Sequence, residues 1–293
     1  MGYYKMTMLE ESLHIKGIFS FHFFEYVKNF RGKEEKHDFW EFVYVDYGRI
    51  QVFSDEDSVF LSAGEAFLHK PNELHNIFSM EEYASVIIFS FAAECEKIEC
   101  LCKKALKIYG EEKYVLEQFF QCGSRAFEEP WDIFEQPQVK LAQQMPYGMQ
   151  QVTLRYLEIL LLKLIQKETE GNTGIKQVKD GEIETNMDKV VKILQKHLFD
   201  KLSMEDVSRE SGYSKSYLAK LFKNMANMGV MDYYNQMKIK EAKRMISEGK
   251  NSFAEIAEKL NYSSVHYFSR CFKKSTNMTP SGYKISVKRK MTI

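Results

Sequence analysis

Apolar residues follow two different periods along the chain, one in each half. Between residues 16 and 92, short runs rich in aromatic and β-branched residues are separated by turn-forming segments such as Asp46-Tyr47-Gly48 and Pro71-Asn72-Glu73. This spacing is typical of an all-β sandwich or barrel. The expected strands are Trp40–Val45, Arg49–Phe53, Val59–Leu61, Ala66–His69 and Ser85–Phe91.

Helical spacing begins after the strands. Residues Gly148–Lys167 carry apolar side chains at helical intervals with an excess of leucine, which predicts a helix that covers the barrel or pairs with a second subunit. The next segment, Glu168–Asn186, contains three glycines and few aliphatic residues. Such a composition cannot bury a core, so we predict a flexible linker at 168–186 between domains at 1–167 and 187–293.

The second domain contains an internal repeat with an offset of 49 to 50 residues. Each copy begins with a capping-box pattern, Ser203–Asp206 or Ser252–Glu255, which starts a short helix. That helix ends at Gly212 or Asn261, residues that tolerate a left-handed backbone. A second helix follows within two or three residues, so the pattern predicts two helix-turn-helix units.

Each predicted second helix has an apolar face and a polar face. The apolar face is expected to pack inward and comprises Leu218, Leu221, Phe222, Phe268, Cys271 and Phe272. On the polar faces, Arg270 and Lys220 suit the acceptors of guanine, whereas the neighbouring lysines suit phosphates. The predicted DNA-binding residues are Lys215, Ser216, Lys220, Lys223, His266, Ser269, Arg270, Lys273 and Lys274.

A third helix is expected between the two copies, over Met231–Gly249. A helix of this size spans about 27 Å. It could hold the two recognition helices roughly one DNA turn, about 34 Å, apart, so that one chain contacts two successive major-groove segments.

Charge separates the two halves. The chain holds 41 Lys/Arg and 41 Asp/Glu, but residues 186–293 hold 21 against 10 and residues 1–185 hold 20 against 31. A net charge of +11 on the second half favours an anionic partner such as double-stranded DNA.

Composition argues against the secreted, fibrous and membrane classes. The first residues, MGYYKMTMLEES, lack the apolar region of a secretory signal, and the longest apolar runs are about half of the roughly 20 residues that a membrane helix needs. The five cysteines are an odd count, typical of reduced thiols rather than a disulfide framework. We therefore expect a cytoplasmic protein.

The motifs SGYSKSYLAKLFK, IKEAKRMI and IAEKLNYSSVHYFSRCFKKSTNMTPSGYK make residues 186–293 resemble the DNA-binding domain of the AraC/XylS family. The resemblance implies seven helices, two helix-turn-helix units, promoter binding that usually activates transcription, contact with RNA polymerase, and a homodimer. The family usually has glycine where this chain has Asn227, Asn261 and Asn277, and asparagine tolerates the same backbone. Ala219 offers no hydrogen bond, so the first unit should contact fewer bases than the second.

The first half is similar to the cupin, a jelly-roll barrel that often forms the ligand pocket of such regulators. The similarity rests on the segment His37–Glu41 followed by Gly48, Gly64, Pro71 and His75. In metal-binding cupins two histidines precede the glutamate, whereas Glu35 stands in place of the first one here. His37, Glu41 and His75 could still form a two-histidine, one-carboxylate metal set. We instead predict that they line a metal-free pocket and that His69 is structural.

A sensing pocket is mostly apolar with a few aimed polar groups. The candidate ligand-binding residues are His37, Phe39, Trp40, Glu41, Tyr44, Phe67 and His75. In an alternating strand Trp40 and Tyr44 share one face and Phe39 and Glu41 share the other. Which face points inward stays open, because both carry aromatic residues.

These patterns predict a DNA-binding transcription regulator, an activator controlled by a small molecule such as a sugar. The alternative is a metal-dependent cupin enzyme with a basic accessory domain, and the incomplete metal set argues against it. A redox sensor at Cys95, Cys100 and Cys102 is a third, weaker hypothesis. The sequence contains no phosphate loop, nucleophile elbow or dinucleotide fingerprint. We therefore predict no catalytic residues and no cofactor.

Overall fold

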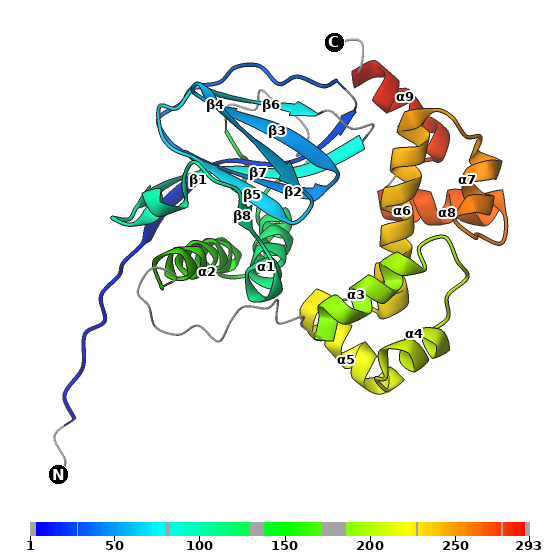
Figure 1. The fold of residues 1–293 in the computed structure, drawn as a ribbon. Helices are drawn as coiled ribbons and strands as arrows, with labels where there is room; N and C mark the ends of the chain where they lie inside the picture. The colour runs from blue at the N-terminus through cyan, green and yellow to red at the C-terminus, as the bar shows by residue number, and fades with distance from the viewer. Residues whose placement is uncertain are drawn as a thin grey trace.

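The computed structural model describes residues 4–27, 29–79, 83–128, 138–170, 186–226, 228–276 and 278–290. Two antiparallel sheets lie in the first half of the molecule (Figure 1). One sheet has five strands in the order β1-β7-β2-β5-β8, and the other has three in the order β4-β3-β6. The strands are β1 His14–Val27, β2 Trp40–Tyr47, β3 Arg49–Ser54, β4 Asp57–Ser62, β5 Glu65–His69, β6 His75–Ser79, β7 Tyr83–Glu94 and β8 Leu106–Lys107.

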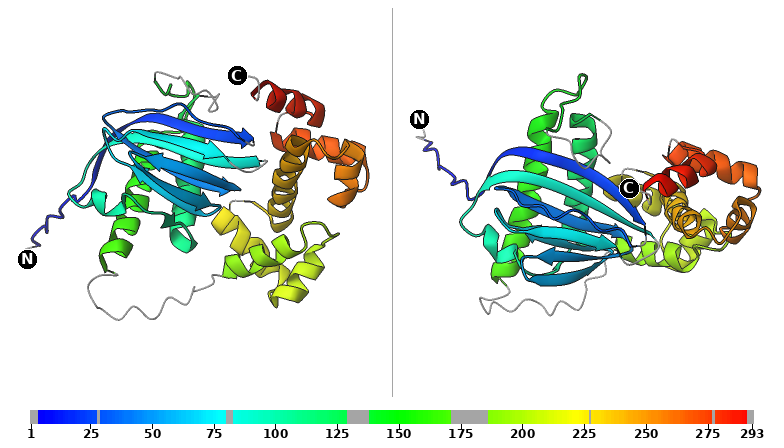
Figure 2. Two further views of the ribbon diagram at one scale, coloured as in Figure 1. Left: turned by 45° about the horizontal axis from the view of Figure 1, so that its top comes forward. Right: turned by 90° about the horizontal axis from the view of Figure 1, so that it is seen from above.

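Apolar side chains fill both faces of the five-stranded sheet. One face packs against the three-stranded sheet, and the other packs against α1 (Gly110–Ala126) and α2 (Met149–Glu170), which follow the short helix η1 (Ile98–Leu101) (Figure 2). Strand β2 contributes Trp40 and Tyr44 to the helix-covered face, and Val43 and Val45 to the interior between the sheets. Both faces are therefore buried, which is why both are aromatic or aliphatic in sequence.

All five predicted strands are present, each within a few residues of its expected bounds, and β1, β6 and β8 are three further strands that the sequence pattern does not assign. The leucine-rich helix is present as α2. It continues through residues 168–170 of the predicted linker, where Lys104 forms an ion pair with Glu168. The rest of the predicted linker, residues 171–185, lies outside the described residues.

The second half is helical, with seven α-helices among its described residues, the number that the resemblance implied. They are α3 Asn186–Lys196, α4 Met204–Ser211, α5 Lys215–Ala226, α6 Val230–Glu248, α7 Phe253–Lys259, α8 Val265–Thr276 and α9 Pro280–Lys290. Helix α6 belongs to two apolar cores, one shared with α3, α4 and α5 and one shared with α7, α8 and α9. None of the described helices is both long and apolar enough to cross a membrane.

Local sequence explains where the short helices begin and end. The Ser203 hydroxyl accepts a hydrogen bond from the Asp206 N–H at 3.2 Å, and Ser252 with Glu255 forms the same box. Helix α4 ends at Gly212 with φ 74°, and Asn261 after α7 has φ 57°, so the predicted left-handed positions are confirmed. Asn227 and Asn277 lie outside the described residues.

Candidate functional site

Helices α5 and α8 each bury one face and expose the other. Leu218 and Phe222 of α5 and Phe268 and Phe272 of α8 are fully buried, as their spacing predicted. The opposite faces hold the predicted DNA-binding residues. Lys215, Ser216, Lys220, Lys223, His266, Arg270, Lys273 and Lys274 are exposed, and Ser269 is half-buried. The two polar faces are therefore open to a partner, while their contact with DNA stays a prediction.

Two of these cations have neighbours that orient them. Lys215 forms an ion pair with Glu205 of α4, and both side chains are more than half exposed. Because exposed pairs contribute little free energy, a phosphate can replace this partner at small cost. The Arg270 guanidinium lies 5.3 Å from the centroid of the Tyr267 ring one turn earlier on α8, close enough for a cation–π contact.

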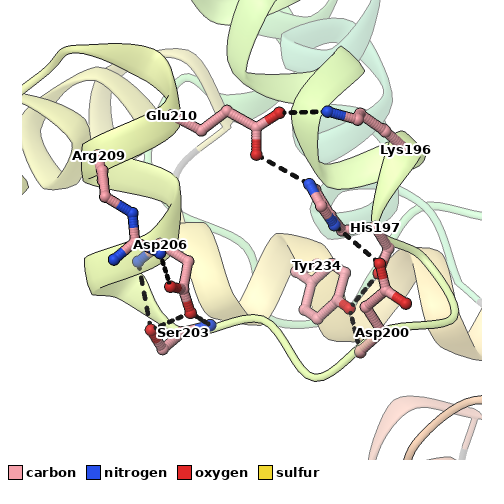
Figure 3. A network of polar contacts seen from close by, with 8 residues as sticks. All are labelled: Lys196, His197, Asp200, Ser203, Asp206, Arg209, Glu210 and Tyr234. Atoms are coloured by element: carbon pink, nitrogen blue, oxygen red, sulfur yellow. Dashed lines mark hydrogen bonds and ion pairs between the residues drawn. The ribbon is translucent and has the colours of Figure 1, made fainter.

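The first helix pair is further tied to α3 by a polar network (Figure 3). His197, just after α3, places Nδ1 2.8 Å from Asp200 Oδ2 and Nε2 2.8 Å from Glu210 Oε2 of α4. Hydrogen bonding to Asp200 and then to Glu210 raises the pKa of His197. The Tyr234 hydroxyl of α6 donates to the carbonyl oxygens of His197 and Asp200, so α3, α4 and α6 share one polar junction.

Helix α6 also lies beside the strand ends of the first half (Figures 1 and 2). Lys240 Nζ approaches the two Asp46 carboxylate oxygens of β2 at 2.8 and 2.7 Å, and the Tyr47 hydroxyl donates to Glu241 Oε2 at 2.8 Å. Lys243 pairs with Glu25 of β1, and both side chains are mostly buried. The helix that joins the two predicted recognition helices is thus held by acidic residues of the first half.

The charge on Asp46 depends on this contact. Burial would raise the pKa of the Asp46 carboxyl, but attraction to Lys240 and the hydrogen bond from Lys240 outweigh it and lower the pKa. Nearby on α1, burial raises the pKa of Glu117. Separation of the two halves would therefore leave Asp46 without the cation that stabilises its charged form.

A second constellation lies between the two sheets of the first half, where polar side chains interrupt the apolar core. His75 of β6, Glu41 of β2 and His69 of β5 are at most 8% exposed, and His37 precedes β2 and is half-buried. His37 Nε2 lies 3.6 Å from Glu41 Oε2, and His75 Nε2 lies 3.4 Å from Glu41 Oε1. The Ser90 hydroxyl of β7 donates to Glu41 Oε2 at 3.0 Å. We call His37, Glu41 and His75 the buried triad.

The environment of the triad favours charge on Glu41. Burial would raise the pKa of the Glu41 carboxyl, but interactions with His37 and His75 outweigh it and hold the pKa well below its usual range. Burial lowers the pKa of His75, whereas Glu41 raises it by a larger total, so the net shift is upward. His69 differs, because burial dominates and lowers its pKa.

The other predicted ligand-binding residues divide between two places. The Phe39 ring stacks on His37 with 3.9 Å between centroids, and Phe67 lies 4.8 Å from His69, which in turn stacks on His75 of the triad. Trp40 and Tyr44 point to the opposite face of the sheet and pack beneath α1 and α2. The structure therefore brings together His37, Phe39, Glu41, Phe67 and His75 and separates Trp40 and Tyr44 from them.

Sequence reasoning missed two features of these sites. Glu73 is 2% exposed and holds two histidines in place, because its carboxylate lies 3.3 Å from His69 Nδ1 and its carbonyl oxygen accepts from His75 Nδ1 at 2.9 Å. The Lys240–Asp46 contact joins residues 194 positions apart. A buried glutamate after a Pro-Asn turn resembles an ordinary loop residue in sequence. Neither Glu73 nor the Lys240–Asp46 contact can therefore be recognised from the neighbouring residues alone.

Known proteins that are similar in sequence match the second half of the chain. Residues 207–285 match a family model described as a helix-turn-helix domain. The regulatory protein SoxS of Escherichia coli strain K12 is 31% identical over 91 residues, which cover 31% of this chain and 85% of SoxS. The regulatory protein PocR of Salmonella typhimurium is 30% identical over 101 residues, which cover 34% of this chain and only 33% of PocR. The chain thus spans about a third of PocR.

A transcriptional regulator from Chromobacterium violaceum, described as containing an AraC-type DNA-binding domain, aligns at 22% identity and a TM-score of 0.34, over 35% of this chain and 91% of its own.

Proposed function

The chain belongs to the AraC family of transcription regulators, and from this premise we propose that α5 and α8 bind two successive major-groove segments of promoter DNA under the control of a small molecule. The observation that carries the proposal is the pair of exposed polar faces on α5 and α8, joined through one helix that belongs to both cores. Helix α6 has 19 residues and spans roughly 28 Å at 1.5 Å per residue. That length suits two helix-turn-helix units about one DNA turn apart.

On these two faces, some residues would contact bases and others would contact phosphates. Arg270 offers a planar fork for the O6 and N7 atoms of guanine, and Lys220 can reach the same acceptors. His266, Ser216 and Ser269 would contact further base edges. Lys215, Lys223, Lys273 and Lys274 would neutralise phosphates, which adds affinity without sequence information.

The first half would act as the sensor, a cupin-type sandwich that holds the effector beside the buried triad. A ligand can switch the protein only if it binds one arrangement of the two halves better than another. The contact of α6 with Asp46, Tyr47 and Glu25 supplies such an arrangement, because β2 carries Asp46 and Tyr47 and also Glu41 of the triad. An effector that shifts β2 would change the positions that α5 and α8 take relative to DNA.

The proposal extends to the oligomeric state of the protein and to its effect on transcription. Val152 and Ile159 on α2 are 43% and 41% exposed and lie two turns apart, so they offer an apolar stripe to a second copy of the chain. We propose a homodimer that activates transcription through contact with RNA polymerase and that has no enzymatic activity of its own.

The test is enrichment of fragmented host DNA by the full-length protein at about 150 mM salt, where non-specific binding is weak. We expect a small set of promoter fragments for the wild type and none for the double variant Lys220→Ala/Arg270→Ala. The double variant Lys250→Ala/Lys259→Ala is the matched control, since it removes the same charge outside α5 and α8. Equal enrichment by all three proteins, or none by the wild type, would overturn the proposal.

A further inference from the structure

One buried lysine lies at the point where α6 passes from one apolar core to the other. The N-terminal part of α6, including Val230 and Tyr234, packs into the core of the first helix pair, and the C-terminal part, including Ile239 and Ile246, packs into the core of the second. Lys238 stands between these two parts and is only 4% exposed. Lysine is almost never fully buried unless it is paired, so this position requires an explanation.

The Lys238 ammonium bridges the two helix pairs. Its Nζ donates one hydrogen bond to the Asp200 carbonyl oxygen at 3.0 Å and another to the Leu260 carbonyl oxygen at 2.7 Å. Asp200 lies in the segment between α3 and α4, whereas Leu260 lies in the turn between α7 and α8. One side chain of α6 therefore joins the segment that leads into the first pair to the helix turn of the second pair.

Two aromatic rings lie beside the same ammonium. Its Nζ is 4.6 Å from the centroid of the Tyr234 ring and 5.7 Å from that of the Tyr262 ring, distances at which a ring attracts a cation. The Tyr234 hydroxyl also donates to the Asp200 carbonyl oxygen (Figure 3). Nearby, the Asn261 side chain donates to the Phe199 carbonyl oxygen at 3.4 Å, so the same two segments meet a second time.

The buried charge itself opposes folding. Burial lowers the pKa of Lys238 to about 8, and attraction to Asp200 only partly opposes that shift. The two hydrogen bonds go to neutral carbonyl oxygens, so they do not recover the full cost of removing the ammonium from water. An apolar side chain of similar size would avoid this cost. The position of the ammonium is therefore explained better by geometry than by stability.

A bond beside the helix axis constrains what α6 alone leaves free. A single helix fixes the distance between two units attached to it, but long helices curve and kink. A small rotation in the middle of α6 would become a large displacement of α5 relative to α8. Because Lys238 ties the two units together away from the axis, it restricts that rotation.

We propose that Lys238 is a positioning residue that fixes the orientation of α5 relative to α8 and so sets the spacing of the two DNA half-sites that one chain accepts. This role requires that both helices bind DNA, as proposed above. An added base pair moves one half-site by about 3.4 Å and turns it by about 35°. A rigid pair of recognition helices should reject this change, whereas a hinged pair should follow it.

The experiment measures binding of the full-length protein to duplexes in which the two selected half-sites are moved apart or together by one base pair. In the wild type the change should weaken binding by about tenfold or more, the order of one mismatched base pair, and in Lys238→Met by about threefold or less. Methionine is unbranched and of similar length but has no N–H to donate.

Two matched variants separate the bridge from the loss of charge and from the loss of a bond to the first pair. Lys250→Met removes the same charge from a side chain that is 70% exposed. Tyr234→Phe removes the other donor to the Asp200 carbonyl oxygen but leaves the Lys238 bridge in place. Both variants should keep the wild-type preference for spacing. A role of Lys238 in stability alone predicts a lower unfolding temperature for Lys238→Met with an unchanged preference for spacing.

Amide hydrogen exchange tests the bridge without DNA. The Asp200 and Tyr262 amides donate to the His197 and Ala257 carbonyl oxygens at 2.9 and 2.8 Å, so their exchange reports opening of the two bridged segments. Lys238→Met should speed exchange at both amides, while those in the middle of α5 and α8 keep their protection. If Lys238→Met does not fold, Lys238→Gln replaces it, because a glutamine side chain is one atom shorter and should not bridge both carbonyl oxygens.

Equal loss of affinity in the wild type and the Lys238 variant when the spacing changes would overturn the proposal, as would unchanged exchange at the Tyr262 amide. Absence of any selected half-site for the wild type would instead contradict the proposed binding to DNA. The exchange measurement would then still decide whether Lys238 holds the two segments together.

Discussion

The two helix pairs of the second half are built alike but present different chemistry to solvent. Both begin with a capping box, both turn at a left-handed residue, and both bury two large side chains of the second helix. On the exposed faces, Ala219 and Lys220 of α5 stand where α8 has Ser269 and Arg270. The repeat thus keeps what folding requires and varies what a partner would meet.

Their surroundings differ as well. The first pair is tied to α3 through His197, and α5 lies near α1 of the first half. The second pair is closed by α9, where Tyr283 is buried against Phe272 with 5.5 Å between ring centroids. We infer that the pairs have similar stability within their own cores but unequal roles in recognition.

The largest expected effect tests the likeness of the two cores. Phe222 and Phe272 are both fully buried, so Phe222→Ala and Phe272→Ala should each lower the free energy of unfolding by about 3–5 kcal/mol. Phe60→Ala is the control, because that side chain is 54% exposed. Urea denaturation followed by circular dichroism measures all three, and a loss below about 1 kcal/mol in one pair only would show that the cores are not equivalent.

The next effect tests the difference between the exposed faces. Arg270→Ala should weaken binding to a selected promoter duplex by about 1–3 kcal/mol, roughly 5- to 150-fold, and should relax the preference at one base pair. Lys220→Ala should cost less, because a lysine lacks the bidentate fork. Fluorescence anisotropy on duplexes altered one base pair at a time measures both effects.

Lys273→Ala is the control for that measurement. A phosphate contact carries no sequence information, so this variant should weaken every duplex alike and reduce the salt dependence by about one charge. If Arg270→Ala behaved in the same uniform way, α8 would not contact bases through Arg270.

A smaller effect concerns the two turns. Gly212 has a left-handed backbone, and a Cβ there would meet nothing within 4 Å, so Gly212→Ala should cost only the backbone strain of about 1–2 kcal/mol. Asn261→Gly should stay within about 0.5 kcal/mol of zero, because asparagine already tolerates this conformation. Thermal unfolding of both variants checks this, and a large loss for Asn261→Gly would mean that its side-chain bond to the Phe199 carbonyl matters more than the backbone.

The smallest effect is a pH dependence centred on the first pair. Hydrogen bonds to Asp200 and Glu210 raise the pKa of His197, so its protonated form is favoured by folding. Its contribution to stability is complete below the ordinary pKa of about 6.5 and is lost as the pH rises through the folded-state pKa. Unfolding temperatures of the wild type should therefore fall slightly more between pH 6 and pH 8 than those of His197→Gln. Identical pH profiles would show that His197 makes no such contribution to stability.

Much of the second half could be predicted because its signals are local. The capping hydrogen bonds between Ser203 and Asp206 and between Ser252 and Glu255 span a single helical turn. Gly212 ends α4 through its own left-handed backbone conformation. Burial of Phe268 and Phe272 follows from helical spacing alone. Such features need no knowledge of the rest of the chain.

The first half was less predictable because its decisive contacts are distant in sequence. Alternation placed Trp40 and Tyr44 on one face and Glu41 and Val43 on the other, but it could not tell which face meets helices and which meets a second sheet. Likewise, the pairing of Lys240 with Asp46 depends on how the two halves meet. In sequence, both residues resemble ordinary surface charges.

Selection of bound sequences from a randomised DNA duplex by the full-length protein at about 150 mM salt tests whether one chain contacts two successive major-groove segments. We expect two unequal half-sites about 10 to 10.5 base pairs apart, with the more strictly specified one lost in Arg270→Ala and the other weakened in Lys220→Ala. A single half-site, two half-sites without fixed spacing, or no enrichment would contradict the claim that one chain presents α5 and α8 to successive major-groove segments.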